Sequence, residues 1–130
     1  FTKRMSADDG LCEAYLYRDE KKITLTALLD SGNSLTEPIS HKPVSVIGSD
    51  AFRKLYPEGE PEYYRVIPFH SVGKESGMLK GYFIPRLEIL RNGVKSTFED
   101  VCIAVSAELE SKTEDDQRRV EIILNRRLFL

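Results

Sequence analysis

The sequence has 130 residues, of which 41% are hydrophobic, so it is long enough to form one domain with a buried core. Its 19 basic and 21 acidic residues give a net charge of −2, and this balance argues against a nucleic-acid-binding surface. The longest apolar run, Val101–Val105, is too short to span a bilayer, and no stretch resembles a signal peptide.

Two strands joined by a charged turn are the first elements that the sequence predicts. Residues 23–29 alternate apolar side chains with threonines, and this period of two indicates a half-buried strand. Residues 11–17 precede them across the charged turn 18–21, so we expect an antiparallel pair. Residues 1–10 are polar and poor in strand formers, and we expect them to be a linker.

A short strand and a short helix follow. Residues 43–47 are apolar and predict the strand, and residues 51–55 predict the helix, which Pro57 ends. Ser49 or Asp50 is the expected N-cap of this helix, since either side chain can accept a hydrogen bond from a free backbone N–H.

A long hairpin is the next predicted feature. Residues 63–69 and 78–84 read as its two arms, and the polar segment 70–77 joins them. The joining segment contains Gly73 and Gly77, so we expect a mobile tip.

The last third of the chain predicts further strands and one more short helix. The dipeptide Asn92-Gly93 is a strong hairpin signal, with strands expected on both sides of it. The fold class is therefore all-β, a small barrel or sandwich with one or two short helices. The remaining segments are strands at 87–91 and 94–105, a charged loop at 108–119, a strand at 120–124 and a helix start at 125–130.

The sequence predicts no metal site and no cofactor. Cys12 and Cys102 lie far apart in strand-like stretches, so we expect free thiols rather than a zinc clip. His41 and His70 have no third ligand at metal-binding spacing, and both are expected at the surface.

The most informative stretch is Ala27-Leu28-Leu29-Asp30-Ser31-Gly32-Asn33-Ser34, where an apolar strand runs into an acid. A glycine at position 32 lets the backbone turn and direct N–H groups towards the Asp30 carboxylate. The hydroxyl groups of Ser31 and Ser34 can fix the orientation of neighbouring groups. Taken alone, Asp-Ser-Gly is a common turn tripeptide, so a turn in which Asp30 caps its own backbone remains an alternative.

Several landmarks together resemble the retroviral-type aspartic proteases over nearly the whole chain. The apolar strand entering Asp30-Ser31-Gly32 matches the family's catalytic motif, and residues 66–82 look like its flap hairpin. The paired strands around Asn92-Gly93 and the closing segment Ile122-Ile123-Leu124-Asn125-Arg126-Arg127-Leu128 follow in the family's order. The resemblance implies a small closed β-barrel of the retropepsin type.

A closer resemblance is to the sporulation sigma-factor processing peptidases of endospore-forming bacteria. It rests on Leu29-Asp30-Ser31-Gly32-Asn33-Ser34-Leu35-Thr36-Glu37-Pro38 and on Ile67-Pro68-Phe69-His70-Ser71-Val72-Gly73-Lys74-Glu75-Ser76-Gly77. It implies one protease domain, residues 1–130, forming the soluble C-terminal part of a longer protein of the cell membrane and facing the mother-cell cytoplasm. The implied partners are a sigma-factor precursor as substrate and an activating signalling protein.

The resemblance also implies roles for individual residues. Asp30 is the catalytic carboxylate, supported by Ser31, Gly32, Asn33 and Ser34. Because Asp-Ser-Gly occurs once, the second carboxylate comes from a second copy in a homodimer. The expected flap and substrate-binding residues are Phe69, His70, Ser71, Val72, Gly73, Gly77 and Met78.

Two positions depart from the family pattern. Ser31 replaces the usual threonine, and Leu124-Asn125 stands where a glycine usually follows the paired isoleucines. Asn125 can adopt a left-handed backbone, so we expect it to substitute for that glycine.

Two other functions and one other second carboxylate stay open. A catalytically silent β-barrel could bind a peptide or sigma factor in the same cleft. A serine hydrolase using Ser31 or Ser34 fits poorly, because neither histidine lies near a nucleophile elbow. Asp100 is the best other source of a second carboxylate within the chain.

Overall fold

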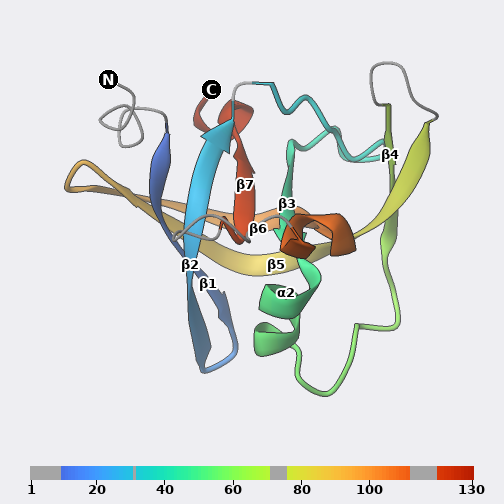
Figure 1. Cartoon of the computed structure of the whole chain (residues 1–130), viewed down its shortest axis with the longest axis horizontal. Coiled ribbons are helices and arrows are strands. Elements are labelled where there is room, and N and C mark those ends of the chain that lie inside the picture. Colours follow the sequence, from blue (N-terminus) through green and yellow to red (C-terminus); the bar gives the residue numbers. More distant parts are fainter. Residues whose placement is uncertain (1–9, 31, 71–75, 112–119) are drawn as a thin grey trace.

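The computed structural model describes residues 10–30, 32–70, 76–111 and 120–130. Strands dominate these residues, and short helices lie between some of them (Figure 1). The strands are β1 (Leu11–Arg18), β2 (Lys21–Asp30), β3 (Val44–Gly48), β4 (Arg65–Phe69), β5 (Gly77–Arg91), β6 (Val94–Ser106) and β7 (Ile122–Asn125). The helices are α2 (Ser49–Leu55) and the 3-10 helices η1 (Ala107–Ser111) and η2 (Arg126–Phe129).

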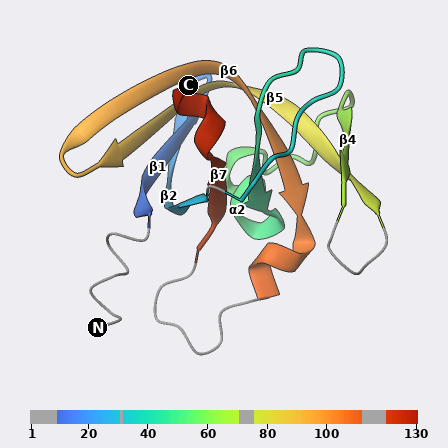
Figure 2. The same cartoon turned by 90° about the horizontal axis from the view of Figure 1, so that it is seen from above.

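The sheet closes on itself and forms a barrel. The strand order is β1-β2-β7-β3-β6-β5-β4, and β1 also pairs with β5, so β4 alone among the described strands lies outside the ring. Figure 2 shows the long β5 and β6 curving around β1, β2 and β7. This architecture confirms the predicted small closed all-β barrel.

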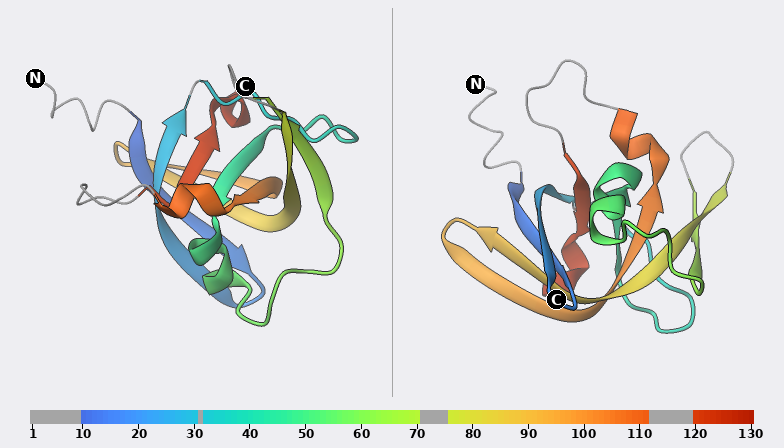
Figure 3. Two further views of the ribbon diagram at one scale, coloured as in Figure 1. Left: turned by 45° about the vertical axis from the view of Figure 1, so that its right-hand side comes forward. Right: turned by 90° about the horizontal axis from the view of Figure 1, so that it is seen from below.

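Alternating side chains fill the barrel. On β2 the residues Ile23, Leu25, Ala27 and Leu29 are buried, as their period of two predicts. Phe52 and Leu55 of α2 join the same core cluster. Figure 3 shows α2 beside the barrel strands.

The predicted tight turn at Asn92-Gly93 is confirmed. Asn92 has φ 53° and Gly93 has φ 79°, and the flanking residues Arg91 and Val94 pair directly. Positive φ at both central residues is the signature of a type I′ turn.

The predicted cap of α2 is wrong. Gly48 occupies the N-cap position in an extended conformation, and no side chain caps the helix. The helix follows β3 without a break, so Ser49 and Asp50 already lie in its first turn, where the Asp50 carboxylate pairs with Arg53.

β5 is one continuous strand, although the sequence predicted two with a break near Pro85. Asp100 on β6 has φ 55°, and the register is unchanged from Ile84↔Val101 to Arg86↔Glu99, which places Asp100 opposite Pro85 with no residue inserted. Pro85 has no N–H to donate, so the ladder omits this one position and continues on both sides of it in the same register.

In the C-terminal part, η1 covers residues 108–111 of the predicted charged loop, and residues 112–119 lie outside the described part. The predicted final helix is the 3-10 helix η2. In the described ranges, no helix has the length and apolar character that a membrane crossing requires.

Candidate active site

Asp30 is the last residue of β2, and its neighbour Leu29 is buried in the barrel core. Asp30 itself is half-buried and pairs in parallel register with Asn125 of β7. The Gly32 N–H donates a hydrogen bond of 2.9 Å to the Asp30 Oδ1. The barrel therefore presents a carboxylate at the end of a strand with a backbone donor directed at it.

The loop after Asp30 is fixed by Asn33. The Asn33 Nδ2 donates to the Val44 carbonyl at 3.0 Å, and the Leu35 N–H donates to the Asn33 Oδ1 at 3.0 Å. Ser34 is exposed, and Ser31 lies outside the described residues. Asn33 thus joins the loop to the first residue of β3.

Asn125, the last residue of β7, supports the same loop and is fully buried. Its Nδ2 donates to the carbonyl oxygens of Leu35 at 3.1 Å and Val44 at 3.2 Å, and its Oδ1 accepts from the Arg127 N–H at 2.9 Å. Its backbone N–H donates to the Ser45 Oγ at 3.0 Å. These bonds satisfy a polar side chain that would otherwise be costly to bury.

The expectation of a left-handed backbone at Asn125 is wrong, because its φ of −82° and ψ of 123° are extended. The Asn125 side chain, rather than a left-handed backbone, supports the loop at this position. The signal in the sequence was an asparagine directly after three apolar residues, a polar group placed where a strand should still be buried.

Gly10, directly before β1, contacts the backbone of Leu29, the residue before Asp30. The Leu29 N–H donates to the Gly10 carbonyl at 2.8 Å, and Gly10 is buried with φ 95°. A Cβ at this position would lie 2.6 Å from the Leu29 carbonyl oxygen. The close approach requires glycine here.

The predicted hairpin exists as β4 and the first part of β5. Phe69 pairs with Gly77, and a Cβ on Gly77 would lie 2.5 Å from the Phe69 Cζ, so the ring lies over the glycine. Below the tip, the His70 Nδ1 and the Ser76 Oγ are 3.0 Å apart. The predicted flap residues Ser71, Val72 and Gly73 lie outside the described residues.

A groove of about 490 Å³ separates the hairpin from the barrel. Three of the expected substrate-binding residues, Phe69, Gly77 and Met78, line it, but Asp30 does not. Leu35 lines the groove and also belongs to the loop after Asp30, where its backbone is hydrogen-bonded to the side chains of Asn33 and Asn125. The other lining residues are Val46, Leu79, Val105, Ser106, Ala107 and Glu108.

Asp100 is engaged elsewhere. Lys42 Nζ lies 3.2 Å from the Asp100 Oδ2 and donates to the Asp100 carbonyl at 2.7 Å. Among the described residues, no second carboxylate is hydrogen-bonded to Asp30. The described part of one chain thus offers one carboxylate at this site.

The cysteine thiols are free and the histidines are exposed, as the sequence predicted. Cys12 and Cys102 are free, and burial raises the pKa of the Cys102 thiol to about 11. His41 and His70 are exposed. No group of three or more His, Cys, Asp or Glu side chains among the described residues is arranged to hold a metal ion.

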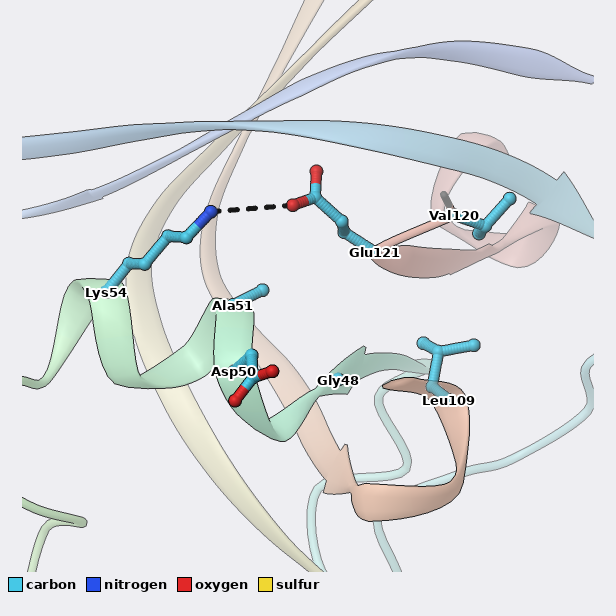
Figure 4. A pocket seen from close by; sticks show the side chains of 7 residues that line it. All are labelled: Gly48, Asp50, Ala51, Lys54, Leu109, Val120 and Glu121. Carbon is cyan, nitrogen blue, oxygen red and sulfur yellow. Dashed lines mark ion pairs between the residues drawn. The ribbon is translucent and has the colours of Figure 1, made fainter. Parts of the chain in front are cut away.

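A second cavity, of about 340 Å³, lies between α2, η1 and the residues before β7 (Figure 4). Two of its charged lining residues, Lys54 and Glu121, pair with each other at 3.6 Å. Glu121 directly precedes β7, whereas Asp30 pairs with the last residue of that strand. The cavity is thus separate from the Asp30 site.

Comparison with known proteins gives two matches. The family model described as sporulation factor SpoIIGA matches residues 1–117. A sporulation sigma-E factor-processing peptidase from Priestia megaterium is 26% identical over 91 residues, covering 55% of this chain and 30% of the relative. The chain therefore spans less than a third of that relative's length. No solved structure matches.

Proposed function

The chain belongs to the SpoIIGA family of sporulation factors, and from that premise we propose that it is the catalytic domain of an aspartic endopeptidase. The single observation that carries the proposal is the Asp30 carboxylate at the end of a buried strand, bonded by the Gly32 N–H at 2.9 Å. Asn33 and Asn125 hold the loop that follows it, as a site with fixed geometry requires.

The mechanism needs two carboxylates, and we propose that a second copy of the chain supplies the other Asp30 in a two-fold symmetric dimer. Two adjacent carboxylates share one proton, because both cannot ionise side by side. The ionised member takes a proton from a water molecule that attacks the scissile carbonyl carbon. The protonated member donates a hydrogen bond to the carbonyl oxygen, and the amide nitrogen leaves with a proton.

The groove beneath the hairpin is the proposed site for a substrate side chain. Most of its lining is apolar, including Leu35, Val46 and Phe69, with Ser106 and Glu108 as the polar members, which suits a hydrophobic residue of an extended peptide. The peptide backbone would run from this groove to Asp30 along the loop that Asn33 holds, and the hairpin would close over it in the manner of a retropepsin flap.

The substrate and the location are proposed from the family. The relative's name specifies processing of sigma-E factor, so we propose a sporulation sigma-factor precursor as the substrate, cleaved after activation by a signalling protein. We also propose that the longer protein lies in the cell membrane, with this domain in the cytoplasm.

Incubation with a sigma-factor precursor tests the proposal. The wild-type chain should shorten the precursor, and Asp30→Asn should abolish cleavage while the circular dichroism spectrum stays unchanged. Asp100→Asn is the matched control, because it changes an exposed carboxylate paired with Lys42, and it should retain activity. Near-normal cleavage by a folded Asp30→Asn would exclude the aspartic mechanism and leave a different catalytic site.

A further inference from the structure

The hairpin projects from the barrel as a two-stranded arm. β5 pairs with β6 from Arg91 back to Lys80, whereas the residues from Gly77 to Leu79 pair with β4 alone. In the described sheet β4 has β5 as its one neighbour. The position of the arm over the groove therefore depends on side-chain contacts between β4 and the rest of the molecule.

One of these contacts is apolar. Ile67 of β4 is fully buried in a small cluster with Val44, Cys102 and Ala104. This cluster attaches the middle of β4 to the barrel. Leu35 of the loop after Asp30 packs against the cluster, together with Leu79 and Phe83 of β5.

The other contact is ionic and comes from that loop. The Glu37 Oε2 lies 3.3 Å from the Arg65 Nη1, at the end of β4 farthest from the tip. The Glu37 side chain is only 1% exposed, whereas that of Arg65 is 40% exposed. Glu37 therefore carries a buried negative charge between the Asp30 loop and the hairpin arm.

The loop holds the Glu37 carboxylate in one orientation. The carboxylate accepts hydrogen bonds from the Ser40 N–H at 2.7 Å, the Ser40 Oγ at 2.6 Å and the Ile39 N–H at 3.2 Å. Burial raises the pKa of Glu37, but these bonds and Arg65 outweigh it and hold the pKa at about 2. The group is therefore ionised at neutral pH.

Arg65 has few other polar partners. Its guanidinium lies 5.0 Å from the centroid of the Phe83 ring on β5, and its Nη1 is buried without a hydrogen bond. The contact with Glu37 is thus a charge attraction without hydrogen-bond geometry. Such a contact needs the positive charge of residue 65 more than the shape of a guanidinium, so lysine should preserve most of it.

We propose that Glu37 is a positioning residue that links the loop after Asp30 to the hairpin through Arg65 and so sets how the hairpin sits over the groove. This inference rests on the proposed function, in which the groove beneath the hairpin holds substrate. Loss of the charge should let β4 and the start of β5 open more often without unfolding the barrel.

Hydrogen exchange measured by mass spectrometry tests the link in the free protein. Glu37→Gln and Arg65→Gln should each raise the exchange rates of amides in β4 and residues 77–80 by about tenfold, whereas β1 and β2 stay unchanged. Arg65→Lys should restore exchange close to the wild-type rate. Lys54→Gln is the matched control, since it removes a comparable pair with Glu121, shown in Figure 4, and should leave the hairpin unaffected.

Unchanged hairpin exchange in both Gln variants would overturn the proposal, and so would an equal increase in β1 and β2, which would indicate general destabilisation. If Glu37→Gln does not fold, the comparison of Arg65→Gln with Arg65→Lys decides alone.

In the cleavage assay, Glu37→Gln should raise KM while kcat stays within about twofold, because closure of the hairpin precedes the chemical step. A wild-type chain without cleavage activity would contradict the proposed function but leave the exchange result standing.

Discussion

At the scale of single residues, the asparagine at position 125 shows how the barrel supports its candidate site. Its buried side-chain amide donates hydrogen bonds to the carbonyls of Leu35 and Val44, and it caps η2 by accepting one from the Arg127 N–H. The sequence identified Asp30 and Gly32, because an acid after an apolar strand is a local pattern. It could not identify the partners of Asn125, which are about 80 to 90 residues away in the chain.

Asn125→Ala should therefore destabilise the fold by about 2 to 4 kcal/mol, because it removes the three hydrogen bonds of a fully buried amide and leaves a cavity in its place. Urea denaturation measures this loss. Asn33→Ala removes two bonds from a half-buried side chain and should cost less. Equal losses for the two variants would contradict a special role for Asn125.

Glu37 gives a prediction for the pH dependence of stability. Its pKa is about 2 in the folded chain and near the ordinary 4.5 in the unfolded chain, so between these values the unfolded chain binds more protons. Its stabilisation is therefore complete above about pH 5 and lost as the pH falls towards 2, with a slope of at most about 1.4 kcal/mol per pH unit.

The free energies of unfolding of the wild type and Glu37→Gln, measured by urea denaturation at several pH values, should converge as the pH falls through this window. A difference between the two proteins that stays constant from pH 6 to pH 3 would mean that the Glu37 pKa is not lowered.

At the scale of elements, local patterns predicted β2, the hairpin arms and the Asn92-Gly93 turn, since each depends on neighbouring residues. The break expected near Pro85 was wrong, because pairing with β6, a different strand, holds the residues on both sides of the proline in one register. Similarly, the Glu37–Arg65 pair joins two segments whose proximity no local pattern reveals. Contacts between distant segments are the part of this fold that the sequence did not predict.

The attachment of the hairpin to the barrel can be tested at Gly81. A Cβ there would lie 2.8 Å from the Ile67 Cγ1 and 3.3 Å from the Cys102 Sγ, inside the cluster that holds β4. Gly81→Ala should cost about 1 to 3 kcal/mol in the free energy of unfolding, because the packed neighbours must move. Thermal denaturation should show a lowered Tm, and a Tm equal to that of the wild type would mean that the cluster is loosely packed.

At the scale of the whole molecule, the described part of one chain supplies a barrel, a hairpin, a groove and one carboxylate at the end of β2. Length, composition and strand periodicity were sufficient to predict a small all-β domain. The resemblance to known proteases supplied the proposed chemistry, and the dimer is the part of the proposal on which that chemistry depends.

Mixing wild-type and Asp30→Asn chains tests this central claim most directly. The substitution is nearly isosteric, so mixed dimers should form freely, and a mixed site has one carboxylate and one amide that cannot share the proton. At equal amounts, fixed total protein and concentrations well above the dimer dissociation constant, about one quarter of the dimers keep both carboxylates. A shared site gives about one quarter of the all-wild-type cleavage rate, and a rate of about one half would mean that each chain carries a complete site of its own.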